Sequence, residues 1–418
     1  MNRIMDSRNL NESKNSSNYS QDDSVYYRFF LLFQHFFFKI FGLAPWAIDF
    51  SEIFNRNRKV GNQNFQWKFS YIGSFYNILL FLVLSSLSLY NLLGKLLESS
   101  IYSSLLVSTV VEFLYFTLLC VSFISLIYTF RQKRLISVNN RFKNIDGVLN
   151  KCACYEKIKD NTNHVIFVIN FLLTIGGTII MDLYYFPLIS VFFENLPTVI
   201  SGILIIQYAM LLYRVNKRFK SINSTISKSF TIKCNEDQTQ ISSVTQQLLL
   251  RESVFNDIDN LKLAFMELRE MCHDIANFYG IPILIVILSF GIRAISTLYF
   301  VVMSIFKVSV IRHKWHVDAI RLLWISFLFT TFTSSVTKII KQNMILGKTI
   351  NYLTDQNSMD EKIKTKLSKF SSDLWHLKIE LTACEIIPLD RTLLATIIGT
   401  LATYLIIGVQ FGLNAKSD

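Results

Sequence analysis

The sequence predicts an all-α membrane protein with seven transmembrane helices, a cytoplasmic N-terminus, an extracellular C-terminus and helical extensions in the cytoplasm. Composition is the first observation, because 51% of the 418 residues are hydrophobic and only 17% are charged, as is typical of multi-span membrane proteins. The second is a set of seven apolar stretches that can cross a bilayer. The third is the clustering of Lys and Arg in alternate connections, which sets orientation.

The seven predicted spans lie at 69–93, 101–130, 165–186, 197–213, 279–306, 317–340 and 393–413. Together they form a predicted transmembrane domain over residues 69–413. The fourth span is short and begins at Pro197. We expect this proline in the first helical turn, where its missing N–H is not needed.

Charge placement predicts the orientation. Of the 42 Lys and Arg residues, 34 lie in the N-terminal segment and in the connections after spans two, four and six, against five in the alternate set. Basic residues near span ends are retained on the cytoplasmic side. We therefore expect a cytoplasmic N-terminus, and we interpret the net charge of +12 as membrane anchoring rather than as a nucleic-acid-binding surface.

The segment before the first span divides in two. Residues 1–27 are polar and rich in Asn and Ser, so we expect a disordered cytoplasmic tail. Residues 28–68 contain an apolar stretch from Phe29 to Phe50 that includes Gln34, His35 and Lys39. We interpret this region as an interfacial or re-entrant helix, with an eighth span as the alternative.

Two cytoplasmic connections, 214–278 and 341–392, are longer than linkers need to be and are predicted to be helical anchor regions. In the first, apolar residues repeat at alternating spacings of four and three, which predicts one helical seam and a partner helix. The seam consists of Val254, Ile258, Leu261, Phe265, Leu268, Cys272, Ile275 and Tyr279. A bundle between subunits and a hairpin within one chain both satisfy this pattern.

The last predicted span carries a polar stripe along one helical face. No charged residue occurs between Thr392 and Ala415, and the stripe contains Thr392, Thr396, Gly399, Thr403, Ile407, Gln410 and Asn414. The opposite face of the helix, called the oily face below, is apolar and consists of Leu394, Ile397, Leu401, Leu405 and Val409. Small and hydroxyl residues at this spacing favour close packing with another helix, or a face that lines an aqueous path; the pattern leaves both open.

A second candidate site is an aromatic and charged cavity that opens to the outside among spans two to six. Ionisable groups at membrane depth are costly and therefore mark sites. The candidate ligand-pocket residues are Glu112, Asp182, Tyr185, Arg293, Tyr299, Arg321 and Trp324. Each also has an ordinary explanation, because charged pairs can form within a bundle and aromatic side chains favour the interface.

No enzymatic motif is present: we find no phosphate-binding glycine loop, no nucleophile elbow and no paired-histidine metal motif in the sequence. His313 and His316 are three residues apart, which is weak evidence for a metal ligand pair. We therefore expect neither catalytic residues nor a metal nor a cofactor.

The chain resembles the insect gustatory receptors, which belong to the insect chemoreceptor superfamily. The resemblance rests on Thr403-Tyr404, five residues, then Gln410-Phe411 in the last span. The segment from Phe41 to Trp46 and the residues from His273 to Gly280 support it. Gly408 departs from the signature, which usually has a bulkier apolar residue at this position.

The resemblance implies a plasma-membrane, ligand-gated, non-selective cation channel of four subunits in a sensory neuron or another chemosensory cell. It places Thr403, Tyr404, Gln410 and Phe411 on the pore-lining helix, with Gln410 and Phe411 at an extracellular gate. Expected partners are a small-molecule tastant, membrane lipid, and identical or different gustatory receptor subunits. Leu405 stands where the sugar-sensing branch has an acidic residue, so the ligand class stays open.

Three other functions compete with a homomeric channel. A metabotropic receptor requires the opposite orientation, which the charge asymmetry opposes. A secondary transporter predicts internal repeats and broken helices at mid-membrane, and the chain has only five prolines. An obligate subunit of a heteromeric receptor has the same sequence features as a homotetramer.

Overall fold

A computed structural model describes residues 29–48, 66–97, 105–155, 162–174, 188–236, 244–305, 315–355, 360–376 and 378–414. The described elements are mainly helical. The helices are Phe29–Ile40, α2 (Tyr71–Leu97), α3 (Leu105–Leu149), α4 (Thr162–Leu172), α6 (Leu188–Glu236), α7 (Val244–Ile305), α8 (Trp315–Thr354), α9 (Glu361–His376) and α10 (Arg391–Asn414). Two short antiparallel pairs join β1 (Ala47–Ile48) to β2 (Trp67–Lys68) and β3 (Thr382–Ala383) to β4 (Ile387–Pro388). The predicted tail 1–27 lies outside the described residues.

Each predicted span lies mainly in a helix where the structure describes it. The span 165–186 begins in α4 and leaves the described residues after Thr174. The other predicted spans fall within α2, α3, α6, α7, α8 and α10, apart from residues 69–70, which precede α2, and residues 101–104 and 306, which lie outside the described residues. Four described helical segments are long and apolar enough to cross a membrane: Tyr71–Gly94, Asn195–Ser229, Glu252–Tyr299 and Ala319–Thr354. These segments make the chain a membrane protein.

The expected position of Pro197 is wrong. Helix α6 begins at Leu188, so Pro197 lies inside the helix rather than in its first turn. Proline removes one helical hydrogen bond. Membrane helices tolerate this loss because neighbouring groups can satisfy the freed carbonyl.

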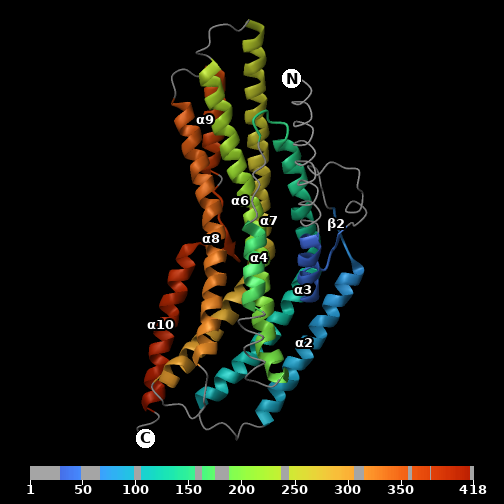
Figure 1. Cartoon of the computed structure of the whole chain (residues 1–418), viewed down its shortest axis with the longest axis vertical. Coiled ribbons are helices and arrows are strands. Elements are labelled where there is room, and N and C mark those ends of the chain that lie inside the picture. Colours follow the sequence, from blue (N-terminus) through green and yellow to red (C-terminus); the bar gives the residue numbers. More distant parts are fainter. Residues whose placement is uncertain are drawn as a thin grey trace, which may run out of the picture. The chain divides into compact units, whose positions relative to one another are not determined.

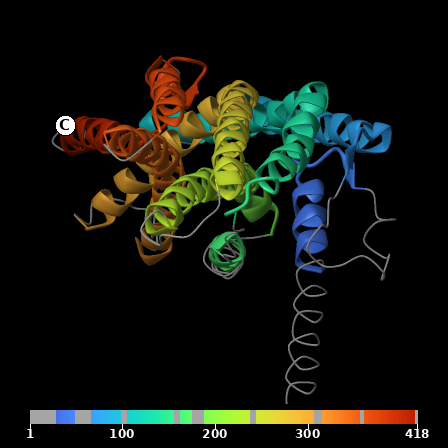
Figure 2. The ribbon, with the colours of Figure 1, turned by 90° about the horizontal axis from the view of Figure 1, so that it is seen from above.

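Long uninterrupted helices form the larger of two compact units, which contains residues 84–122 and 141–418. Helices α6, α7 and α8 run alongside one another (Figures 1 and 2), and α9 and α10 each contact α7 and α8. Helix α6 continues from its apolar segment through the basic residues after Tyr213 without a break. Several helices therefore extend beyond the predicted membrane spans.

The predicted apolar seam of α7 is buried within this chain. All eight seam residues are less than 9% exposed, and α6, α8 and α9 contact α7. An aromatic series crosses the bundle, since Phe265 lies edge-on to Phe219 of α6 at 5.7 Å and to Phe370 of α9 at 5.9 Å between ring centroids. Ion pairs Lys262–Asp373 and Lys366–Asp259 flank the seam. The partner helix implied by the periodicity is thus intramolecular.

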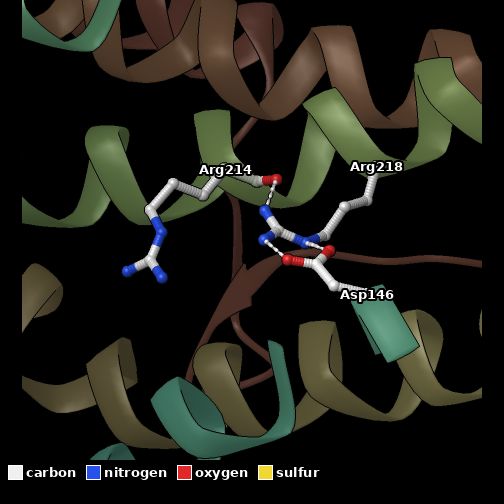
Figure 3. Close-up of polar contacts among 3 residues, drawn as sticks. All are labelled: Asp146, Arg214 and Arg218. Atoms are coloured by element: carbon white, nitrogen blue, oxygen red, sulfur yellow. Dashed lines mark hydrogen bonds and ion pairs between the residues drawn. The ribbon is translucent and has the colours of Figure 1, made fainter. Parts of the chain in front are cut away.

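A charged clamp joins the end of α3 to α6 (Figure 3). Arg218 donates two hydrogen bonds to the carboxylate of Asp146, at 2.9 and 2.8 Å, and a third at 3.0 Å to the carbonyl of Arg214. The guanidinium groups of Arg214 and Arg218 each lie 4.3 Å from the ring centroid of Phe142. Only Arg218 of the two points toward Asp146. Paired hydrogen bonds between Arg and a carboxylate fix orientation as well as distance, so this ion pair fixes the C-terminal end of α3 against α6.

The smaller unit contains residues 1–83 and 123–140, and its centre is the turn from Phe41 to Trp46. Gly42 has a positive φ of 74°, a backbone conformation that glycine adopts without penalty. The Asn77 side chain donates to the carbonyl of Gly42 at 2.7 Å. A Cβ at Gly73 would lie only 1.8 Å from the carbonyl oxygen of Pro45. Glycine is therefore required at position 73.

Aromatic side chains pack around His35 in the same unit. Its ring lies 5.9 Å from Trp67 and 6.4 Å from Trp46 between centroids, and the two tryptophans lie 5.7 Å apart. Burial, with a smaller contribution from Lys39, lowers the pKa of His35 to about 4. The imidazole is therefore neutral near pH 7, as a ring packed among indoles requires.

Candidate functional site

Three predicted ligand-pocket residues come together in one cavity between α6, α7 and α8. Arg293 of α7 and Arg321 and Trp324 of α8 line it, and the other described lining residues are Asn195, Thr198, Val199 and Ile325. The cavity volume is about 10 Å³, which is room for about one water molecule. A larger ligand therefore requires the walls to move.

Three other helices contact Trp324 of α8. Its indole N–H donates to the Asn170 side chain of α4 at 3.2 Å. Its ring lies 6.0 Å edge-on from Phe290 of α7. A Cβ at Gly202 of α6 would lie 2.7 Å from Trp324 Cζ2, so glycine there lets the indole approach the α6 backbone. The side chain is 1% exposed, and any shift of α4, α6 or α7 changes the wall that it forms.

The charges that line the cavity, among the described residues, are both positive. Arg293 is 6% exposed and Arg321 is 8% exposed. Arg293 Nη2 donates to Asn195 Oδ1 at 3.5 Å, a long hydrogen bond. Guanidinium groups can only donate, and the hydroxyl of Thr198 and the amide of Asn195 add further polar groups. The cavity therefore matches a ligand rich in hydrogen-bond acceptors, with an apolar part against Trp324.

The remaining predicted pocket residues are not brought to this cavity by the described structure. Tyr299 lies on α7 and is half-buried, but it does not line the cavity. The backbone of Glu112 is part of α3, while its side chain lies outside the described residues. Asp182 and Tyr185 also lie outside the described residues. These positions stay predictions.

The contribution of α6 to the cavity was missed by sequence reasoning. Asn195 and Thr198 flank Pro197, one helical turn apart, and Asn195 is 5% exposed. A buried amide beside a proline near the start of an apolar segment is the available signal. Gly202 has no comparable signal, because its role depends on the partner helix that faces it.

Helix α10 presents its polar stripe outward. Every stripe residue whose side chain is described is exposed: Thr392, Thr396, Gly399, Thr403, Ile407 and Gln410. The oily face is half-buried against α7 and α8: Leu394, Ile397, Leu401, Leu405 and Val409. A lone helix in lipid favours the reverse arrangement, with its oily face outward. Ile398 and Ile406 of the same helix are also exposed, at 64% and 59%, so the polar stripe is one part of a largely exposed helix.

The predicted gate residues share this helix. The side chains of Thr403 and Gln410 are exposed, and that of Tyr404 is 54% exposed. Thr403 Oγ1 donates to the carbonyl of Gly399 at 3.0 Å, so its donor is satisfied within the helix and its lone pairs remain available. Phe411 lies in α10, and its side chain is outside the described residues.

Comparison with known proteins agrees with these features. A model of the 7tm chemosensory receptor family matches residues 31–415. Among Drosophila melanogaster proteins, the putative gustatory receptor 28b is 42% identical over 79 residues, covering 19% of this chain and 17% of that protein. The gustatory receptor for sugar taste 43a is 26% identical over 141 residues, covering 33% and 32%. The chain thus spans less than half the length of these curated relatives.

A solved structure shares the fold. The insect olfactory receptor OR5 from Machilis hrabei aligns with a TM-score of 0.59 over 93% of this chain and all of that chain, at 10% identity. The same receptor in complex with eugenol gives a TM-score of 0.58. The family match covers most of the sequence, and its relatives are receptors rather than enzymes. The chain therefore belongs to the 7tm chemosensory receptor family.

Proposed function

We propose that this chain is a gustatory receptor that works as a ligand-gated, non-selective cation channel. In this proposal four subunits, identical or mixed, surround a pore in the plasma membrane of a chemosensory cell, and α10 of each subunit lines it. The single observation that carries the proposal is the outward polar stripe of α10. Thr403, Tyr404 and Gln410 are exposed on a helix whose oily face packs inward.

The energetic argument favours water over lipid on this face. The hydroxyls of Thr396 and Thr403 donate within the helix, but the exposed amide of Gln410 and the hydroxyl lone pairs find no hydrogen-bond partner in hydrocarbon, which is costly. A pore supplies water to the same groups. Close packing against another helix also shields small polar residues, and a ring of α10 helices around a pore provides both environments.

The ligand in this proposal is an extracellular small molecule that enters the cavity between α6, α7 and α8. The two buried arginines and Asn195 favour hydroxyl, carbonyl or carboxylate oxygens on the ligand. Because the cavity holds about one water, binding has to expand it. A ligand that prefers the expanded state shifts the population toward that state, and α10, which contacts α7 and α8, moves with it.

Cysteine accessibility on α10 tests the pore assignment. Thr403→Cys places a thiol on the exposed stripe, and Leu405→Cys places one on the half-buried face two residues away. A charged, membrane-impermeant methanethiosulfonate reagent applied to the open receptor should block current through Thr403→Cys. It should leave Leu405→Cys and the unmodified chain unchanged. If the reagent leaves the currents of both variants unchanged although surface expression is normal, α10 does not line the pore.

A further inference from the structure

The hairpin that leads into α10 has an unusual turn. Strands β3 and β4 pair Ala383 with Ile387, and the amide of Ile386 donates to the carbonyl of Ala383 at 3.0 Å. The two central residues, Cys384 and Glu385, have φ values of 53° and 61°. Turns with two positive φ values normally use Asn and Gly. The backbone is thus held in a conformation that its own residues disfavour.

The contact that holds this turn is a buried glycine of α7. A Cβ at Gly280 would lie 2.9 Å from the backbone nitrogen of Cys384 and 3.3 Å from its sulfur. The nearest obstacle is backbone, which cannot rotate away as a side chain can. Glycine at 280 therefore permits a direct approach of the hairpin to α7.

The hairpin also leads directly into α10. Leu389 donates its amide to the carbonyl of Leu381 at 3.1 Å, and both side chains are at most 3% exposed. Asp390 then caps α10, accepting the amide of Thr392 at 2.9 Å, as is usual at helix starts. Seven residues separate Cys384 from the first residue of α10, Arg391.

The same helix α7 carries the cavity residue Arg293. Thirteen residues, or about 20 Å of helix, separate it from Gly280, with Pro282 between them. Proline removes one hydrogen bond of the helical ladder and makes local bending easier. Helix α7 thus joins the cavity at one end of this segment to the hairpin at the other.

We infer that the contact between Gly280 and the Cys384–Glu385 turn transmits movement of α7 to α10, and that Gly280 is a positioning residue for gating. This inference rests on the proposed channel function. A rigid, strained turn transmits displacement better than a relaxed loop, because it has little freedom to absorb the displacement. The conformational cost of the turn is thus explained by a mechanical role.

Glycine substitutions on α7 give a matched test. Gly280→Ala adds one methyl group against the Cys384 backbone, whereas Gly291→Ala, on the same helix, adds it to open space. We expect Gly280→Ala to reduce maximal ligand-evoked current per surface receptor severalfold while ligand affinity in a binding assay stays unchanged. Gly291→Ala should match the unmodified chain. Equal currents in the two variants would overturn the inference, and so would a loss of affinity that accounts for the whole loss of current.

A second readout separates this inference from the channel proposal. Lys378 and Arg391 are exposed trypsin sites on either side of the hairpin. Displacing the hairpin should speed tryptic cleavage at these sites in Gly280→Ala relative to Gly291→Ala, with or without any current. If the unmodified chain conducts no current either alone or together with a second gustatory receptor subunit, the channel proposal fails. Equal cleavage rates in Gly280→Ala and Gly291→Ala would show that the contact with Gly280 does not hold the hairpin in place, whatever the outcome for the channel proposal.

Discussion

Gly202 shows how one missing methyl group can shape a binding cavity. The site for its Cβ is 2.7 Å from Trp324 Cζ2, 3.0 Å from Trp324 Cη2 and 3.2 Å from Leu328 Cδ1. Trp324 also packs on Phe290 and donates to Asn170, so the indole has little room to retreat. The cavity wall therefore depends on a residue without a side chain.

At this scale we predict that Gly202→Ala destabilises the protein by about 1–3 kcal/mol, the usual cost of overpacking a core, and weakens the ligand response. Gly347→Ala on α8 is the control, because nothing lies within 4 Å of its added Cβ. Gly347→Ala should leave the free energy of unfolding unchanged or raise it slightly, since alanine has a higher helix propensity than glycine. Thermal unfolding of the detergent-solubilised variants measures the difference. Equal melting temperatures would show that the indole relaxes without cost.

Single residues also mark the limit of sequence reasoning about the site. Arg293 and Arg321 stood out in the sequence because ionisable side chains at membrane depth are costly, and Trp324 follows Arg321 closely at the start of the predicted sixth span. Asn195 and Thr198 of α6 were not singled out, since their role depends on which helices adjoin. The turn at Cys384 and Glu385 was not predictable, because neither residue type favours positive φ and the contact with Gly280 of α7 depends on the tertiary fold.

Helix Phe29–Ile40 has two unlike faces. Phe30 and Phe38 are buried, whereas Phe29, Phe33, Phe36 and Ile40 are exposed along the other side. A row of exposed aromatic residues on a helix that also carries Lys39 is the pattern of an interfacial helix. We propose that this face lies in the membrane interface and that the helix does not cross.

Spin labels test this proposal at the scale of the element. Spin labels are attached to the introduced cysteines of Phe29→Cys and Phe36→Cys. The two positions lie seven residues apart, or about 10 Å along the helix. An interfacial helix places both labels at the same shallow depth, measured by electron paramagnetic resonance with oxygen and a nickel chelate as relaxants. A crossing helix places them at depths that differ by most of that length, which would restore the eighth-span alternative.

The helices were more predictable than their connections. Apolar length and a heptad-like seam identified the helical segments, including the continuation of α7 across its predicted membrane boundary. The start of α6 was misplaced, because a proline is compatible with a first turn and also with the interior of a membrane helix. The β3–β4 hairpin escaped prediction since two-residue strands carry almost no periodic signal.

At the scale of the whole molecule, the charge asymmetry and the outward polar stripe of α10 lead to one account. The basic connections predict a cytoplasmic N-terminus, which is the orientation opposite to that of a metabotropic seven-helix receptor. In the proposed channel the stripe faces a path shared by several subunits. The proposed ligand site is the cavity between α6, α7 and α8, and α7 and α8 both contact α10.

Whole-cell recording from cells that express this chain alone, with G-protein signalling blocked, distinguishes a ligand-gated channel from a metabotropic receptor. Sugars, amino acids and bitter compounds are applied outside, with surface expression confirmed in the same cells. A channel formed by this chain should give a rapid, non-selective cation current evoked by at least one acceptor-rich compound, and a severalfold smaller current in Gly280→Ala. A response that appears only when G-protein signalling is intact would contradict it and would favour the metabotropic alternative.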